Sequence, residues 1–105
     1  MPLRAVPLWR DTDATVDTTG VAYDLQASST HPIHATQVKV YVSEAAYVGV
    51  GRTSSPPTAS ADNTVYQEAA TEEVYTFSDN QNFTKYLYVY AVTGTITAVR
   101  VSAFG

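Results

Sequence analysis

The closing part of the chain constrains the fold most, because it holds a long apolar run without a charged residue. The run from Tyr86 to Val92 alternates aromatic and aliphatic residues, and no charged residue occurs between Tyr86 and Arg100. The segment Thr93-Gly94-Thr95 interrupts the run, and a second β-rich run follows from Ile96 to Phe104. Two strand-forming runs around a glycine-containing turn predict a β-hairpin.

The turn leaves the register of this hairpin open. A type II′ turn that begins at Gly94 places Tyr88 opposite Val101, whereas a longer loop centred on Gly94 places Leu87 opposite Val101. A shift of one residue exchanges the two faces of a strand. Both registers therefore stay open at the level of sequence.

Neither face of the first run is polar. One face carries Tyr86, Tyr88, Tyr90 and Val92, and the other carries Leu87, Val89 and Ala91. A strand that is apolar on both sides needs a cover on both sides. In so small a chain one cover is the protein's own core, and we expect the other cover to be a neighbouring molecule.

Composition limits the classes of function. The chain has 105 residues, the size of one domain, and it contains no cysteine, which suits folding in a reducing cytoplasm. Its net charge is −4 and its six basic residues are spread singly, whereas nucleic-acid binding needs clustered Lys and Arg. No apolar run reaches the length of about 20 residues that a membrane span needs. We therefore expect no nucleic-acid partner and no membrane partner.

Residues 1–12 are predicted to form an extended N-terminal arm or an edge strand, followed by a single β domain over residues 13–105. Pro2 and Pro7 exclude a helix and bias the residues before them to extended geometry. They also interrupt the apolar stretch that a signal peptide would need. The apolar residues of the segment are Leu3, Val6, Leu8 and Trp9. The segment is either an edge strand packed on its own domain or an arm across a neighbouring subunit.

Period-2 alternation predicts several short strands. One covers residues 21–25 and another covers residues 37–43, where Val38, Val40 and Val42 point inward. Two further strands are predicted near residues 64–69 and 74–77. With turn signals about every 8–12 residues and no helical pattern, the predicted fold is all-β. We expect a small antiparallel β-sandwich or jelly-roll-like barrel of roughly seven to nine short strands with an extended N-terminal arm.

Two segments between these strands have a particular composition. Residues 52–63 are rich in Ser, Thr and Pro and predict a mobile loop, which either reaches a neighbour or is a surface insert. Gly49 and Gly51 form a Gly-x-Gly that no helical pattern follows, so it is not a nucleotide-binding fingerprint. These glycines instead indicate a bulge or a close approach of the backbone.

No motif for catalysis, cofactor binding or metal binding is found. His31 and His34 flank a proline in a polar loop, and the sequence suggests no third ligand. Asp11 and Asp13 resemble the start of a calcium loop, but the rest of the EF-hand spacing is absent. Gly-x-Ser-x-Gly, phosphate loops, HExxH and CxxC are all missing. We therefore expect no enzyme, no cofactor and no metal site.

The closely spaced tyrosines are candidates for recognition. Rings with polar tips on a half-exposed sheet suit sugar stacking or a protein interface, although one or two of them are also expected to close the domain's own core. With the N-terminal segment they give the candidate protein-interface residues Leu3, Val6, Leu8, Trp9, Tyr86, Tyr88 and Tyr90.

Two segments, Met1–Asp13 and Tyr88–Val101, resemble small virion proteins of tailed bacteriophages, which are cysteine-free β proteins rich in Thr, Ser and Val. Several proteins of this class are decoration or cement proteins that clamp neighbouring capsomers. They share no defining motif, so no functional residue carries over. The resemblance implies a non-enzymatic virion structural protein, a capsid decoration or cement protein that binds and stabilises the phage capsid shell.

The resemblance also implies a partner and a location. The partner would be the major capsid protein at the outer capsid surface of the virion. The chain would bind it as a homo-oligomer, a trimer or dimer, after synthesis in the bacterial host cytoplasm, and many weak copies would gain from avidity. The alternatives are a head–tail connector, a tail or fibre component, or a sugar-binding β module.

Overall fold

The structure is a computed structural model that describes residues 9–25, 37–76 and 86–104. These residues contain eight strands and no helix, which confirms the predicted all-β class and a small β-sandwich. No helix in this part of the chain is therefore long and apolar enough to cross a membrane. The strands are β1 (Trp9–Asp13), β2 (Val21–Asp24), β3 (Gln37–Val42), β4 (Ala46–Gly51), β5 (Thr64–Gln67), β6 (Thr71–Thr76), β7 (Tyr86–Ala91) and β8 (Val99–Phe104).

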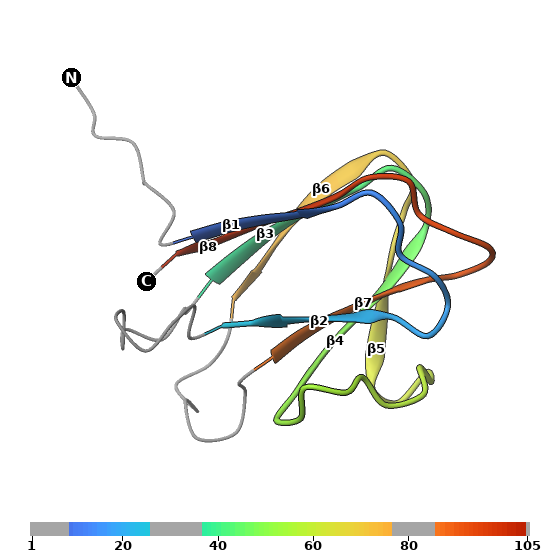
Figure 1. The fold of residues 1–105 in the computed structure, drawn as a ribbon, viewed down its shortest axis with the longest axis horizontal. Coiled ribbons are helices and arrows are strands. Elements are labelled where there is room, and N and C mark those ends of the chain that lie inside the picture. Colours follow the sequence, from blue (N-terminus) through green and yellow to red (C-terminus); the bar gives the residue numbers. More distant parts are fainter. Residues whose placement is uncertain (1–8, 26–36, 77–85, 105) are drawn as a thin grey trace.

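The strands form two antiparallel sheets that pack face to face (Figure 1). The first sheet has the order β1-β8-β3-β6, and the second has the order β2-β7-β4-β5. Consecutive strands often lie in different sheets, so the chain crosses between the two layers several times. The edge strands are β1 and β6 in the first sheet and β2 and β5 in the second.

The core follows from the period-2 pattern of the central strands. Val38, Val40 and Val42 are fully buried, as the alternation in residues 37–43 predicted. Val40 pairs with Val101 of β8 in the first sheet. The core cluster joins inward residues of both sheets, which are Val16, Tyr23, Leu25, Val38, Val40, Val42, Ala46, Val48, Leu87, Val89, Ala91, Ile96, Val99, Val101 and Ala103.

The predicted hairpin between the last two runs is wrong. β7 lies in the second sheet and β8 in the first, so neither of the two predicted registers forms. The connection over residues 92–98 instead crosses the edge of the core. Its Ile96 is fully buried and forms an isolated bridge with Val16. Because each run has an aliphatic face, placing the two runs in opposite sheets buries both faces in one core.

Two strand boundaries differ from the prediction. β5 ends at Gln67 and β6 begins at Thr71, so the turn lies at residues 68–70 rather than 70–73. Ala70 makes this early turn with a φ of 55°. At the N-terminus, β1 is an edge strand paired with β8, and residues 1–8 lie outside the described part of the chain.

Candidate interaction site

The tyrosines of β7 lie on the outer face of the second sheet, away from the core. They alternate with the core residues Leu87 and Val89. Nevertheless Tyr88 and Tyr90 are only 2 % and 1 % exposed. Their rings meet edge to face, with centroids 6.4 Å apart and planes at 62°. Something other than the opposite sheet therefore covers this face.

The cover is the loop over residues 52–63. The Tyr88 hydroxyl donates to the carbonyl oxygen of Thr53 at 2.6 Å and accepts from the Thr53 amide at 3.2 Å. The Tyr90 hydroxyl donates to the carbonyl oxygen of Pro57 at 2.8 Å. Burial raises the pKa of Tyr90, and the nearby Tyr88 adds to this rise. The expected neighbouring molecule is thus replaced by the chain's own loop.

Two residues of the candidate interface, Tyr88 and Tyr90, lie beneath this loop. Tyr88 and Tyr90 cannot contact a partner while the loop covers them, because their rings are already buried and their hydroxyls already bonded. They serve the alternative role that the sequence allowed, which is closing the domain itself. Tyr86, at the start of β7, is half-buried and takes part in an interaction within the chain.

Gly20 and Gly51 leave space for the tyrosine rings, and Gly49 and Gly51 show the close approach that was one of the two expectations for them, the other being a bulge. A Cβ atom on Gly51 would lie 2.6 Å from the Tyr88 hydroxyl oxygen, and one on Gly20 would lie 2.5 Å from Cδ2 of Tyr90. A Cβ on Gly49 would lie 2.7 Å from the carbonyl oxygen of Asn63. The role of Gly20 could not be inferred from sequence, because Gly20 and Tyr90 are far apart along the chain.

The other sequence-predicted candidates lie mostly outside the described residues. Leu3, Val6 and Leu8 precede the first described residue, and both His31 and His34 lie in the interval 26–36. The backbone of Trp9 in β1 pairs with that of Ala103 in β8. The Trp9 side chain is not among the parts that the structure describes. The structure therefore leaves the predicted role of the N-terminal segment untested.

A groove opens along the edge of the sandwich that is formed by the edge strands β5 and β6, away from β1 and β2. These strands leave a common turn and then diverge, so the two sheets separate along this side (Figure 1). The groove has a volume of about 470 Å³. Its lining residues are Val48, Gly49, Val50, Asp62, Asn63, Thr64, Val65, Tyr75, Thr76 and Leu87.

The groove is lined mainly by apolar side chains. Val50 and Val65 share the inner face of the second sheet with Val48, yet they are 44 % and 54 % exposed. The large hydrophobic side chains that are exposed in the described residues all belong to β4, β5 and β6, and they are Val50, Val65, Tyr66 and Val74. Of these four, Val50 and Val65 line the groove, whereas Tyr66 lies against Tyr47 and Val74 pairs with the outward-facing Lys39.

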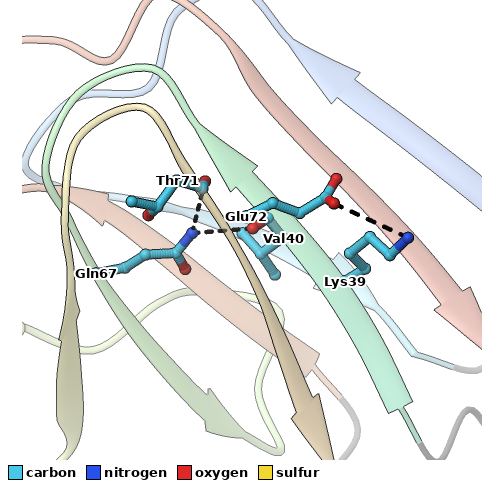
Figure 2. A network of polar contacts seen from close by, with 5 residues as sticks. All are labelled: Lys39, Val40, Gln67, Thr71 and Glu72. Carbon is cyan, nitrogen blue, oxygen red and sulfur yellow. Dashed lines mark hydrogen bonds and ion pairs between the residues drawn. The ribbon is translucent and has the colours of Figure 1, made fainter.

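A buried glutamine links the two sheets near the turn between β5 and β6 (Figure 2). Gln67 of β5 is 2 % exposed, and its amide nitrogen donates to the carbonyl oxygens of Val40 at 2.9 Å and Thr71 at 3.1 Å. Its amide oxygen accepts from the Tyr75 hydroxyl at 2.8 Å. Burial, assisted by the charge of Glu73, raises the pKa of Tyr75 to about 12. Gln67 thus ties the two sheets together where β5 and β6 are closest.

The other open side of the sandwich has a similar polar tie. The buried Tyr23 of β2 donates its hydroxyl to a carboxylate oxygen of Asp13 in β1 at 2.6 Å. Burial, and then this hydrogen bond, raise the pKa of Tyr23. The Asp11-x-Asp13 pair therefore supplies a structural acceptor. Among the described residues, no three His, Asp or Glu side chains are grouped so that they could hold a metal ion.

The outer face of the first sheet is polar and carries both charge signs. Arg10, Lys39 and Arg100, three of the six basic residues, line a shallow depression of about 360 Å³ on this face. The guanidinium of Arg100 lies 4.4 Å from the centre of the Tyr41 ring. Lys39 approaches Glu72 at 3.9 Å (Figure 2). These exposed contacts are typical of a solvated face, as the pattern of residues 37–43 predicted.

The Glu44 carboxylate stabilises a turn through several hydrogen bonds. The Glu44 carboxylate accepts hydrogen bonds from the Ser43 hydroxyl and from the Thr97 amide, the latter at 2.8 Å. These bonds, the one from Ser43 first, lower the pKa of Glu44. The Ser43 hydroxyl oxygen in turn accepts from the Ala98 amide at 2.9 Å. The network fixes the β3–β4 turn to the connection over residues 92–98, so the serine and the carboxylate have structural roles.

No protein-family model, curated protein or solved structure matches this chain. A functional interpretation therefore depends on the chain's own surfaces. The tyrosine face is covered by the loop and the outer face of the first sheet is solvated. Among the described residues, the groove between β5 and β6 is an open and mainly apolar surface.

Proposed function

We propose that the chain is a non-enzymatic structural protein of a tailed-phage virion, a capsid decoration or cement protein that acts as a homo-oligomer. The observation that carries this proposal is the open apolar groove between β5 and β6, where Val50 and Val65 are about half exposed. The resemblance of Met1–Asp13 and Tyr88–Val101 to small virion proteins supplies the class of partner. The partner is then the major capsid protein at the outer surface of the shell.

The energetics of the groove suit a contact that is repeated many times. Covering apolar surface contributes roughly 25 cal/mol per Å², and this groove is small beside a stable two-protein interface, which buries about 1,200–2,000 Å². A single copy would therefore bind weakly. Many copies held in register on a shell gain affinity by avidity, which is how a small cement protein can stabilise a large particle.

The alternative of a sugar-binding module loses its basis. That alternative relied on an exposed platform of tyrosine rings, but the loop over residues 52–63 covers Tyr88 and Tyr90. A connector, tail or fibre component is not favoured by any described surface. It differs from a cement protein in copy number, because a connector forms one ring per particle.

The experiment is a binding assay with capsid shells of the encoding phage that lack the protein. Purified chain is added, bound copies are counted by quantitative mass spectrometry, and the rupture temperature of the shells is measured. We expect copies in proportion to coat subunits or symmetry axes and a raised rupture temperature. One ring of copies per particle would support the connector instead, and absence of the protein from purified virions would refute the virion role.

A pair of matched variants tests the groove in the same assay. Val65→Asp places a charge in the groove, whereas Val74→Asp places the same charge on the outer face of the first sheet at equal exposure, 54 % against 55 %. Val65→Asp should abolish the rise in rupture temperature and Val74→Asp should preserve it. Equal effects of the two variants would contradict a role for the groove.

A further inference from the structure

The groove lies at the same end of the sandwich as the start of β1. Register places Trp9 opposite Ala103, Ala103 opposite Val38, and Val38 opposite Tyr75. These four residues therefore form one row across the first sheet, from Trp9 at the start of β1 to Tyr75 in the wall of the groove. Residues 1–8 precede Trp9 along the chain, so they are joined to β1 at this end.

We propose that the groove receives the N-terminal arm, residues 1–8, of a second copy of the chain, a proposal that rests on the assembling function given above. The arm supplies the apolar side chains Leu3, Val6 and Leu8. The groove supplies the apolar walls at Val50 and Val65. Mutual burial of these side chains is the driving force for the contact.

The chemistry of the arm matches the groove in two further ways. Pro2 and Pro7 favour an extended chain, which loses little conformational entropy when it binds in a groove. Arg4 is the cation of the arm, and Asp62 lies at the rim of the groove. Opposite charges at such a rim fix the orientation of the bound segment.

A second copy is favoured over the chain's own arm. Eight extended residues span about 26 Å, which exceeds the width of three strand spacings, about 14 Å, between β1 and β6. Crossing that width uses about four of the eight residues. The chain's own arm would therefore bring Leu3 to the groove but leave Val6 and Leu8 short of it, whereas an arm from a second copy can place all three side chains there.

An arm from a second copy does not have to cross the first sheet in this way. It enters from the open side, between the diverging edges of β5 and β6 (Figure 1). Each copy then offers one arm and one groove. An exchange of this kind closes into a symmetric dimer or into a ring such as a trimer, according to the angle between neighbours.

Cysteine cross-linking tests the contact directly, because the chain has no cysteine of its own. One preparation carries Val6→Cys, and a second, size-tagged preparation carries Val65→Cys. The two are mixed and oxidised, and the cross-linked peptides are identified by mass spectrometry. Val74→Cys replaces Val65→Cys in the control, because Val74 is equally exposed but lies outside the groove.

We expect the mixture to give a mixed disulfide at twice the 11.3-kDa chain mass, plus the tag. The Val74→Cys control should lose this product. A double variant, Val6→Cys with Val65→Cys, that closes only an internal disulfide while the mixture gives none would overturn the proposal in favour of the chain's own arm. Equal products from the Val65→Cys and Val74→Cys mixtures would also overturn it.

The same measurements separate this inference from the proposed function. If the chain binds capsid shells but gives no Val6–Val65 cross-link on the shell, the arm-exchange inference fails and the cement function stands. If the cross-link forms in solution but shells are neither bound nor stabilised, the assembly is real and the capsid role fails.

Discussion

At the scale of single residues, the tyrosine face depends on positions that lack a side chain. Gly51 is a strand residue with ordinary backbone angles, so its importance lies in space rather than in conformational freedom. The ring of Tyr88 occupies the space that a Cβ atom would fill. Because the Tyr88 hydroxyl is bonded to Thr53, the ring cannot simply move aside.

Gly51→Ala should therefore destabilise the protein by about 1–3 kcal/mol through overpacking. It should also speed hydrogen exchange at the Thr53 amide, because that amide donates to the displaced Tyr88 hydroxyl. Urea unfolding measures the first effect and exchange mass spectrometry the second.

Gly94→Ala is the control for this substitution. Gly94 has a φ of 62°, and no atom lies within 4 Å of the place that a Cβ atom would take. Alanine there introduces backbone strain of about 1–2 kcal/mol without a clash. It should leave exchange at Thr53 unchanged. Faster exchange in both variants would show that Thr53 responds to stability in general and not to the Tyr88 contact.

At the scale of elements, a buried polar side chain links the two sheets at each edge of the sandwich. Tyr23 joins β2 to β1 on one side, and Gln67 joins β5 to β3 and β6 on the other. A buried polar group stabilises only while all its partners are satisfied. The two ties therefore define how the sheets are held together at their edges.

Gln67→Leu should lower the free energy of unfolding by about 3 kcal/mol, because it leaves the carbonyl of Val40 and the hydroxyl of Tyr75 without their bonds. Gln37→Leu is the matched control, since the exposed Gln37 makes one long hydrogen bond of 3.4 Å. Its effect should stay within about 0.5 kcal/mol. Chemical denaturation measures both, and similar losses would contradict the role of Gln67 as a tie.

The pH dependence of stability involves Tyr75, whose hydroxyl donates to the amide oxygen of Gln67. The pKa of Tyr75 is raised from 10.0 to about 12 in the folded chain, so the unfolded chain loses this proton first as the pH rises. The native state then binds more protons than the unfolded state, and stability must fall between pH 10 and about pH 12. Tyr75→Phe should make this decline shallower. Identical slopes of unfolding free energy against pH in the two proteins would contradict the assignment.

The strands themselves could be predicted from sequence, but their pairing could not. The alternation of Val38, Val40 and Val42 with polar residues fixes both the strand and its inward face. The run that became β7 has two apolar faces and the run that became β8 has one, so local sequence allows both side-by-side pairing and packing across a core. In the structure Ile96, between the two runs, bridges to the distant Val16, and a contact at such separation has no local signal.

At the scale of the whole molecule, the surplus of apolar surface was predicted but its location was not. The sequence placed it on the tyrosine face, which the loop over residues 52–63 covers. The structure places it in the groove, whose walls come from Val50, Val65 and Tyr75 on three different strands. These positions are exposed because β5 and β6 diverge, and the divergence of two edge strands cannot be predicted from the pattern of either one.

The N-terminal arm can be removed without removing any residue of β1. Deleting residues 1–8 leaves β1 and its ladder with β8 intact, so the melting temperature of the isolated chain should stay nearly unchanged. The same deletion removes Leu3, Val6 and Leu8, which are the side chains proposed to fill the groove of a second copy. Self-association and shell binding should therefore be lost. Sedimentation measures the association and calorimetry the melting temperature.

A longer deletion provides the contrast that makes this result specific. Removing residues 1–13 also removes β1, which exposes the edge of β8 and takes away the Asp13 acceptor of the buried Tyr23 hydroxyl. This variant should lose thermal stability as well as assembly, because a buried hydroxyl without a partner is destabilising. If the shorter deletion lowered the melting temperature as much as it lowered assembly, the arm would belong to its own domain, and the groove would need a different occupant.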